Sequence, residues 1–160
     1  MPFQTILRRI AACSALTVGA ASVATVAQAG ECPGGQTVTE SNVQSDAGAK
    51  GVTDTVIGSI DLAEEAPMLD HASFRLRRLE IEPGGVVPWH SHGERPAIIY
   101  IVSGEIIEHR NTCAVPIVHK AGDVATEVHT TAHWWENTTD APVVLLSADI
   151  FPEATDPNQM

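Results

Sequence analysis

The stretch GGVVPWHSHGERPAIIYIVSG, residues 84–104, decides the fold of this chain. It carries His90 and His92 two positions apart, between a glycine pair and the apolar run AIIYIVSG. Side chains two apart on a strand point to the same face, so both imidazoles should share one side of it. Neutral imidazole is a strong ligand for divalent transition metals. The stretch therefore predicts a strand with two metal ligands on one face.

A second histidine cluster follows in GDVATEVHTTAHWWEN, residues 122–137. His133 opens an apparent strand there, and Trp135 shares its face. Two inward histidines on one strand and a third on a distant strand are what a metal site inside a small barrel needs. We therefore expect His90, His92 and His133 to hold a divalent transition metal, with Fe, Mn, Zn, Ni and Cu all open.

Short β-like runs separated by turn residues recur around these two clusters, from Val52 to the run APVVLLSADIF. This spacing predicts an all-β sandwich or barrel over residues 52–151. Residues 30–51 are polar and glycine-rich and are expected to form an extended arm. Residues 152–160 are expected to form a loose tail.

Residues 84–137 resemble the barrel of the cupin superfamily. The first cupin motif matches at Gly84, His90, His92 and Gly104, and the second matches at Gly122, His133 and Asn137. The resemblance implies an antiparallel jelly-roll barrel with a cavity at its mouth, where a divalent transition metal is commonly held. Ala97, Ile99 and Trp135 are expected to line that cavity.

The sequence departs from the cupin pattern where the family usually carries a glutamate ligand. Ala97 occupies that position, while Val128 and Thr130 replace a proline and a glycine of the second motif. Three interpretations stay open. The three histidines act alone, as in the three-histidine cupins that include ferrous dioxygenases; a fourth ligand or supporting residue comes from the loops; or the barrel binds an organic ligand without metal. The candidates for that fourth position are His129, Glu94 and Glu127.

Charge balance favours an anionic ligand for a three-histidine site, because neutral imidazoles leave the charge of a divalent ion uncompensated. Arg95, beside the first motif, is a candidate to bind a substrate carboxylate. In the sequence, no other candidate metal ligand stands at ligand spacing from His71, His109 or His119, so solvated surface positions are expected for them.

The composition describes one small acidic domain. The chain has 160 residues, with 9 Lys and Arg against 20 Asp and Glu and a net charge of −11. This balance argues against nucleic acid or an anionic membrane surface as partner. A small-molecule ligand is expected, and the runs AIIYIVSG and VVLLSADIF also offer surface for a homodimer.

The beginning of the sequence has the features of a secretory signal peptide over residues 1–29. A basic segment, MPFQTILRR, precedes an apolar run over residues 10–26 and the cleavage signature Ala27-Gln28-Ala29. We therefore expect a periplasmic or secreted protein with no stable membrane anchor after cleavage. In such an oxidising compartment Cys32 and Cys113 can pair as a disulfide.

Phosphate-binding glycine loops and the GxSxG motif are absent from the sequence, which argues against phosphoryl transfer and serine hydrolysis. The expected function is that of an exported metal-binding cupin that acts as a small oxygenase-type enzyme with a three-histidine metal site. The alternative is a non-enzymatic module that binds a metal or a small molecule.

Overall fold

The computed structural model describes residues 30–69 and 71–152, and its regular structure is almost entirely β. The elements are β1 (Lys50–Asp61), α1 (Leu62–Glu65), the 3-10 helix η1 (Pro67–Leu69), β2 (Ala72–Ser91), β3 (Ala97–Ser103), β4 (Glu105–Arg110), β5 (Ile117–Lys120), β6 (Val124–Glu127), β7 (Ala132–Glu136) and β8 (Val143–Pro152). The expected signal peptide and residues 153–160 of the expected tail lie outside the described residues. Within the described ranges, no helix combines the length and the apolar character needed to cross a membrane.

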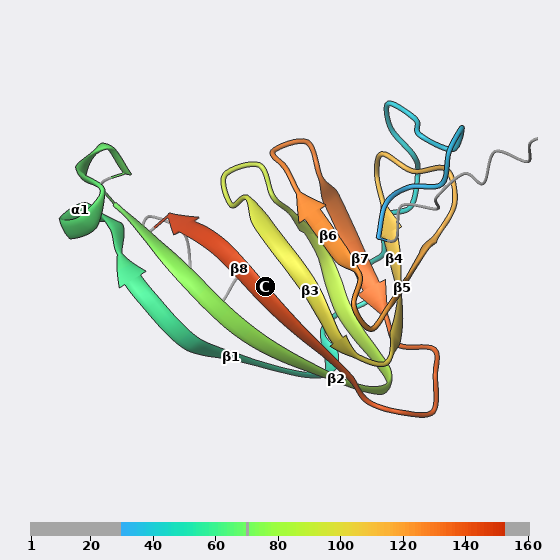
Figure 1. Ribbon diagram of the computed structural model, residues 1–160. Coiled ribbons are helices and arrows are strands. Elements are labelled where there is room, and N and C mark those ends of the chain that lie inside the picture. The colour runs from blue at the N-terminus through green and yellow to red at the C-terminus, as the bar shows by residue number, and fades with distance from the viewer. Residues whose placement is uncertain (1–29, 70, 153–160) are drawn as a thin grey trace, which may run out of the picture.

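The strands form one 8-stranded antiparallel sheet in the order β5-β4-β7-β2-β8-β3-β6, with β1 added to β2. Figure 1 shows this sheet curled into a nearly closed barrel, with α1 at the end of β1 farthest from β4 and β5. Neighbours such as β2 and β8 are far apart in sequence, as expected for a jelly roll. The predicted all-β, antiparallel jelly-roll fold is therefore confirmed.

Strand β2 bends in its middle and changes partner. Its first half, residues 72–81, pairs with β8, and its second half, residues 86–91, pairs with β7. Gly84 adopts a positive φ of 69°, which favours glycine. A Cβ on Gly85 would lie 2.7 Å from the Ile81 side chain. The two glycines therefore permit the bend that carries the end of β2 across to β7.

The inner face of the barrel follows the two-residue period of its strands. On β3, Ile99 and Ile101 are buried, whereas Ile98 and Tyr100 on the outer face are exposed. Strand β8 alternates in the same way along its length. The core consists of Leu79, Ile81, Val87, Ile99, Ile101, Ile106, Ala125, Trp135, Val143 and Leu145.

The N-terminal arm is attached to the connection between β4 and β5. Cys32 and Cys113 form a disulfide, and Thr37 makes an isolated β-bridge to Cys113. Further along the arm, the indole of Trp134 donates a hydrogen bond to the carbonyl of Val43 (2.6 Å). The first strand begins at Lys50, so the arm packs along the barrel before it enters the sheet.

Candidate metal centre

The structure brings three histidines together at one end of the barrel. His90 and His92 lie near the end of β2, and His133 lies on β7 directly opposite His90. The Nε2 atom of His92 is 3.2 Å from Nε2 of His90 and 3.0 Å from Nε2 of His133. The His90 and His133 Nε2 atoms are 3.1 Å apart. The strand pairing thus places three ring nitrogens at the corners of a nearly equilateral triangle.

The other ring nitrogen of each histidine faces a hydrogen-bond acceptor. Nδ1 of His90 lies 2.9 Å from the Pro88 carbonyl, and Nδ1 of His92 lies 2.8 Å from the Arg95 carbonyl. Nδ1 of His133 lies 2.6 Å from a carboxylate oxygen of Glu108. Because carbonyls and carboxylates only accept, these contacts assign the proton of each neutral ring to Nδ1. Each Nε2 then points a lone pair into the triangle.

Burial keeps the two histidines of β2 neutral. Burial, together with the nearby His133 ring, lowers the pKa of His90 well below its ordinary value. The same two causes lower the pKa of His92 to about 3. Neutral imidazole is the form that binds metal ions. The site therefore has its ligand atoms available without first losing a proton.

The size of the triangle fits one metal ion. Imidazole nitrogens bind zinc at about 2.1 Å, so two of them lie about 3.0 Å apart at a right angle and about 3.4 Å apart in a tetrahedron. The observed edges of 3.0 to 3.2 Å lie in this range. Three lone pairs so close together also need a cation or a proton between them. The donor set is thus suited to a divalent transition metal.

The three candidates for a fourth ligand do not join the triangle. Glu94 and His129 are exposed side chains on the loops. Glu127 is buried, but its carboxylate lies behind His133, 3.6 Å from Nδ1 rather than beside Nε2. Among the described residues, the group of side chains able to hold an ion through the three Nε2 atoms contains histidines alone.

A buried charged cluster lies behind His133. Arg110 donates to both oxygens of Glu108 (2.7 and 3.1 Å) and to Glu127 (3.2 Å), while His119 lies 2.8 Å from Glu108. Burial raises the pKa of Glu127. Burial also acts to raise the pKa of Glu108, but hydrogen bonds from His119 and His133 outweigh it and hold that pKa well below its ordinary value. Glu108 is therefore an anion inside the barrel.

The surface position expected for His119 is wrong. Its side chain is fully buried and packs against Trp135, with ring centroids 4.6 Å apart. The reason is the two-residue period of β5, where Ile117 and His119 both face inward. His109 is also removed from solvent in part, because it stacks on Trp134 and lies 2.9 Å from Glu136 on the outer side of the barrel.

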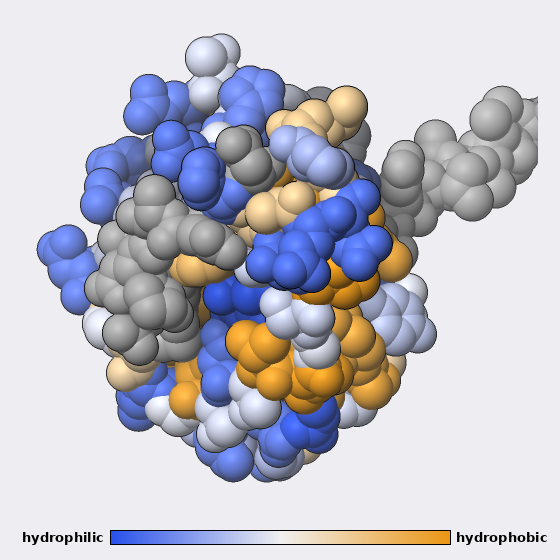
Figure 2. Space-filling model, turned by 90° about the vertical axis from the view of Figure 1, so that its left-hand side faces the viewer, coloured by the Kyte–Doolittle hydropathy of each residue, from blue (hydrophilic) through white to orange (hydrophobic). Residues whose placement is uncertain are grey.

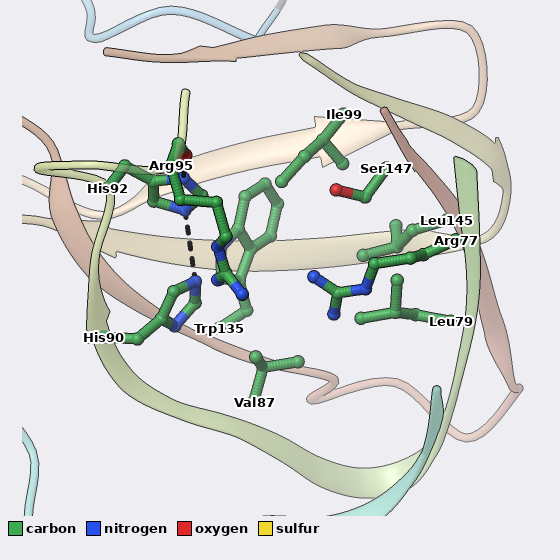
Figure 3. Close-up of a pocket in the computed structure, with 10 residues that line it drawn as sticks. All are labelled: Arg77, Leu79, Val87, His90, His92, Arg95, Ile99, Trp135, Leu145 and Ser147. Atoms are coloured by element: carbon green, nitrogen blue, oxygen red, sulfur yellow. Dashed lines mark hydrogen bonds between the residues drawn. The ribbon is translucent and has the colours of Figure 1, made fainter. Parts of the chain in front are cut away.

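A pocket opens beside the three histidines (Figure 3). It is lined by Arg77, Leu79, Val87, His90, His92, Arg95, Ile99, Trp135, Leu145 and Ser147. The expected wall residues Ile99 and Trp135 are among them, whereas Ala97 is buried in the neighbouring barrel wall and does not line the pocket. Figure 3 shows the guanidinium groups of Arg77 and Arg95 pointing toward each other into the pocket.

The pocket arginines are anchored by Asp149 on β8. Asp149 lies 3.3 Å from Arg77 and 3.8 Å from Arg95, and it accepts two hydrogen bonds from Arg75 (3.0 and 2.7 Å). Arg77 also pairs with Asp54 of β1. The face of the molecule in Figure 2 is hollowed, with hydrophilic residues inside the hollow and hydrophobic ones along one rim. Cationic groups and apolar walls together suit a small organic anion.

Sequence reasoning missed Glu108, Arg110 and Arg77, because charged residues at inward positions are rare. The segment EIIEHR does contain a pattern that predicts their burial: Glu108 and Arg110 follow the apolar Ile106 at two-residue intervals, so all three share one face of the strand.

Asn137, which ends the second motif, has a supporting role: its buried amide donates to the carbonyls of Ile81 and Ala141.

Comparison with known proteins agrees with this geometry. The profile of the cupin domain family matches residues 77–149. Nectarin-1 of Nicotiana langsdorffii x Nicotiana sanderae is 27% identical over 104 residues, which cover 61% of this chain and 45% of nectarin-1. The chain thus spans less than half the length of that relative.

Two solved structures share the barrel. A predicted oxalate decarboxylase from Thermotoga maritima superposes with a TM-score of 0.53 and 28% identity, over 65% of this chain and 84% of the other. The cupin domain of Schizosaccharomyces pombe Cnp3 superposes with a TM-score of 0.51 and 16% identity, over 66% and 69% of the two chains, which shows the fold alone. The profile match, the shared fold and the histidine spacing agree that residues 77–149 of this chain form a cupin domain.

Proposed function

We propose that the chain is an exported metal-dependent enzyme of the oxygenase type, which binds one divalent transition metal through His90, His92 and His133 and acts on a small organic anion. The observation that carries the proposal is the orientation of the three rings. Each Nδ1 faces its own acceptor, so three Nε2 lone pairs converge within 3.0 to 3.2 Å.

An open coordination sphere favours catalysis over a closed structural site. Three protein ligands leave positions for other molecules, as in catalytic metal sites. A bound metal would supply a Lewis acid and, for iron or manganese, a redox partner for the substrate. The residues of the chain supply the surroundings: Val87, Ile99 and Trp135 give apolar walls to the pocket that His90 and His92 also line.

The anionic character of the substrate follows from the charges around the pocket. Arg77 and Arg95 extend into it beside the histidines (Figure 3), and guanidinium groups bind carboxylates in two-point hydrogen bonds. A substrate carboxylate would also balance the charge that three neutral imidazoles leave on the metal. The similarity to a predicted oxalate decarboxylase supports a carboxylate among the compounds to test.

A non-enzymatic binding module is the second candidate, and Ala97 is the observation that favours it. The carboxylate ligand common in cupins is missing at that position, so this barrel can hold a metal or an organic anion without turning it over. Export is supported by the Cys32–Cys113 disulfide, because disulfides persist in oxidising compartments.

The experiment is metal analysis of protein recovered from the periplasm without chelator or histidine tag, beside a His90→Ala/His92→Ala variant. His129→Ala serves as the matched control, because its imidazole is exposed. We expect about one metal ion per chain in the wild type and the control and none in the double variant. The mass of the recovered chain tests cleavage after Ala29.

Metal-loaded protein is then assayed for oxygen uptake with small thiols, diketones and phenolics, and for carbon dioxide release from oxalate. Turnover that disappears in the double variant supports the enzyme. Wild-type protein that stays free of metal after reconstitution would overturn the metal proposal. Metal binding without turnover of any of these compounds would favour the binding module.

A further inference from the structure

His133 differs from the other two histidines in what holds its second nitrogen. His90 and His92 are held by backbone carbonyls, which are neutral. His133 is held by the carboxylate of Glu108 at 2.6 Å. It therefore links the Nε2 triangle on one side to a buried negative charge on the other.

The carboxylate of Glu108 is fixed in place by its own partners. Arg110 binds both of its oxygens, and His119 lies 2.8 Å from the oxygen that His133 leaves free. Glu108 and His119 are completely buried and Arg110 is nearly so. With partners on three sides and no water access, the carboxylate has one position, which aims one oxygen at the ring of His133.

Among the described residues, Glu108 is the carboxylate nearest to the three histidines; Glu127 lies farther away, 3.6 Å from Nδ1 of His133. Ala97 lies opposite Glu127 on β6 and opposite Asp149 on β8, but both carboxylates are engaged by arginines. Glu127 is paired with Arg110, and Asp149 with Arg75 and Arg77. Glu108 is thus the one carboxylate among them within 3 Å of a ring nitrogen in the triangle.

We propose that Glu108 is the positioning residue of the metal centre: through His133 it aims Nε2 at the ion and supplies, one imidazole away, the negative charge that Ala97 does not. This inference rests on the metal site of the proposed function. A carboxylate bound to the far nitrogen of a histidine ligand fixes the ring and makes its metal-binding nitrogen more basic. The negative charge therefore lies on Glu108, behind a ligand histidine, and not on a residue that itself binds the metal.

The first test reads the His133 ring in the metal-free wild-type protein by nitrogen-15 NMR, with the signal assigned through its loss in His133→Gln. We expect a proton on Nδ1, where the ring faces Glu108. A ring whose Nδ1 carries no proton would overturn the inference. Because this test uses the wild-type fold, it remains decisive if substitution of Glu108 destabilises the barrel.

The second test measures Zn²⁺ affinity by competition with a chelator, and the absorption spectrum of bound Co²⁺, for wild type and Glu108→Gln. The glutamine keeps the size of the side chain and removes its charge. We expect about a 10- to 100-fold loss of Zn²⁺ affinity and a shifted Co²⁺ spectrum. Glu136→Gln is the matched control, because Glu136 forms a similar pair with His109 (2.9 Å) outside the barrel, and its affinity should match the wild type.

The outcomes separate this inference from the proposed function. Wild type that binds neither Zn²⁺ nor Co²⁺ overturns the metal site itself. Wild type that binds while Glu108→Gln binds equally well, with an unchanged Co²⁺ spectrum, overturns the role of Glu108 and leaves the metal site intact. A loss in Glu108→Gln that Glu136→Gln does not share supports the inference.

Discussion

The barrel contains two buried charged clusters, one on each side of Ala97, and they differ in whether carboxyl or guanidinium groups are more numerous. Behind His133, two carboxyl groups face the single guanidinium of Arg110. Across the pocket three arginines face two aspartates; these are Arg75, Arg77, Arg95, Asp54 and Asp149. The histidine triangle lies between the first cluster, which we name the negative cluster because its carboxyl groups outnumber its guanidinium group, and the second, which we name the positive cluster because its guanidinium groups outnumber its carboxylates.

This difference indicates how a metal site without a carboxylate ligand can favour both a cation among its histidines and an anion in the pocket beside them. Charges act over longer distances in a barrel interior than in water, because the local dielectric constant is low. The negative cluster favours a cation among the three nitrogens, and the positive cluster favours an anion in the adjoining pocket. Cation and anion are thereby directed to neighbouring positions.

The largest effect should come from breaking the positive cluster at its centre. Asp149→Asn removes the charge that holds Arg75 and Arg77 together. Because the buried guanidinium groups then lose the carboxylate that they share, we expect the free energy of unfolding to fall by about 3–5 kcal/mol, measured by urea denaturation.

Glu105→Gln is the control for this substitution. It removes a carboxylate whose partner, Lys120 at 3.2 Å, is exposed, and an exposed pair contributes at most about 1 kcal/mol. Equal stability losses in the two variants would contradict the structural role of the buried cluster.

The second-largest effect should come from releasing the N-terminal arm, which covers part of the cluster behind His133. The first described residue of the arm, Gly30, lies next to His119: a Cβ built on Gly30 would be 3.4 Å from the histidine Nδ1. The disulfide between Cys32 and Cys113 holds this part of the arm in place. Replacing both cysteines by serine should lower the free energy of unfolding by about 2–4 kcal/mol, as expected for a disulfide that closes a long loop.

Urea denaturation of the oxidised wild type beside the double serine variant measures this loss. Reduced wild type should behave like the variant. If both unfold at the urea concentration of the oxidised protein, the disulfide adds nothing to the stability of the fold.

The comparison of the clusters also shows where sequence reasoning succeeds and where it ends. The barrel and the convergence of His90, His92 and His133 were predictable, because histidines two apart on a strand must share a face. The neighbours of Ala97 were not predictable. Glu127 and Asp149 meet it through strands far away in the sequence, and nothing in the local sequence gives that register.

The candidates for a fourth ligand illustrate the same limit. Glu94 and Glu127 are equally plausible from spacing, yet one is exposed and the other is buried behind His133. Glu108 was overlooked because the sequence of a single strand does not distinguish a buried charged residue from an exposed one. Partners such as Arg110 and His119 make its burial possible, and they become visible only once the strands are paired.

The smallest effect should come from acid acting on the histidines between the two clusters. The pKa of His92 is about 3 in the folded protein, against an ordinary value of 6.5. Between these two pH values the unfolded chain binds a proton at this histidine and the folded chain does not. Acid therefore favours unfolding: stability contributed above pH 6.5 is lost as the pH falls toward 3. Between pH 7.5 and 5.5 we expect metal-free protein to lose about 1 kcal/mol of unfolding free energy for each such histidine.

Urea denaturation at both pH values measures this loss, and Zn²⁺-loaded protein should lose less, because the ion occupies the nitrogens that protons would take. Metal-free protein of equal stability at both pH values would show that the rings are not held neutral by burial.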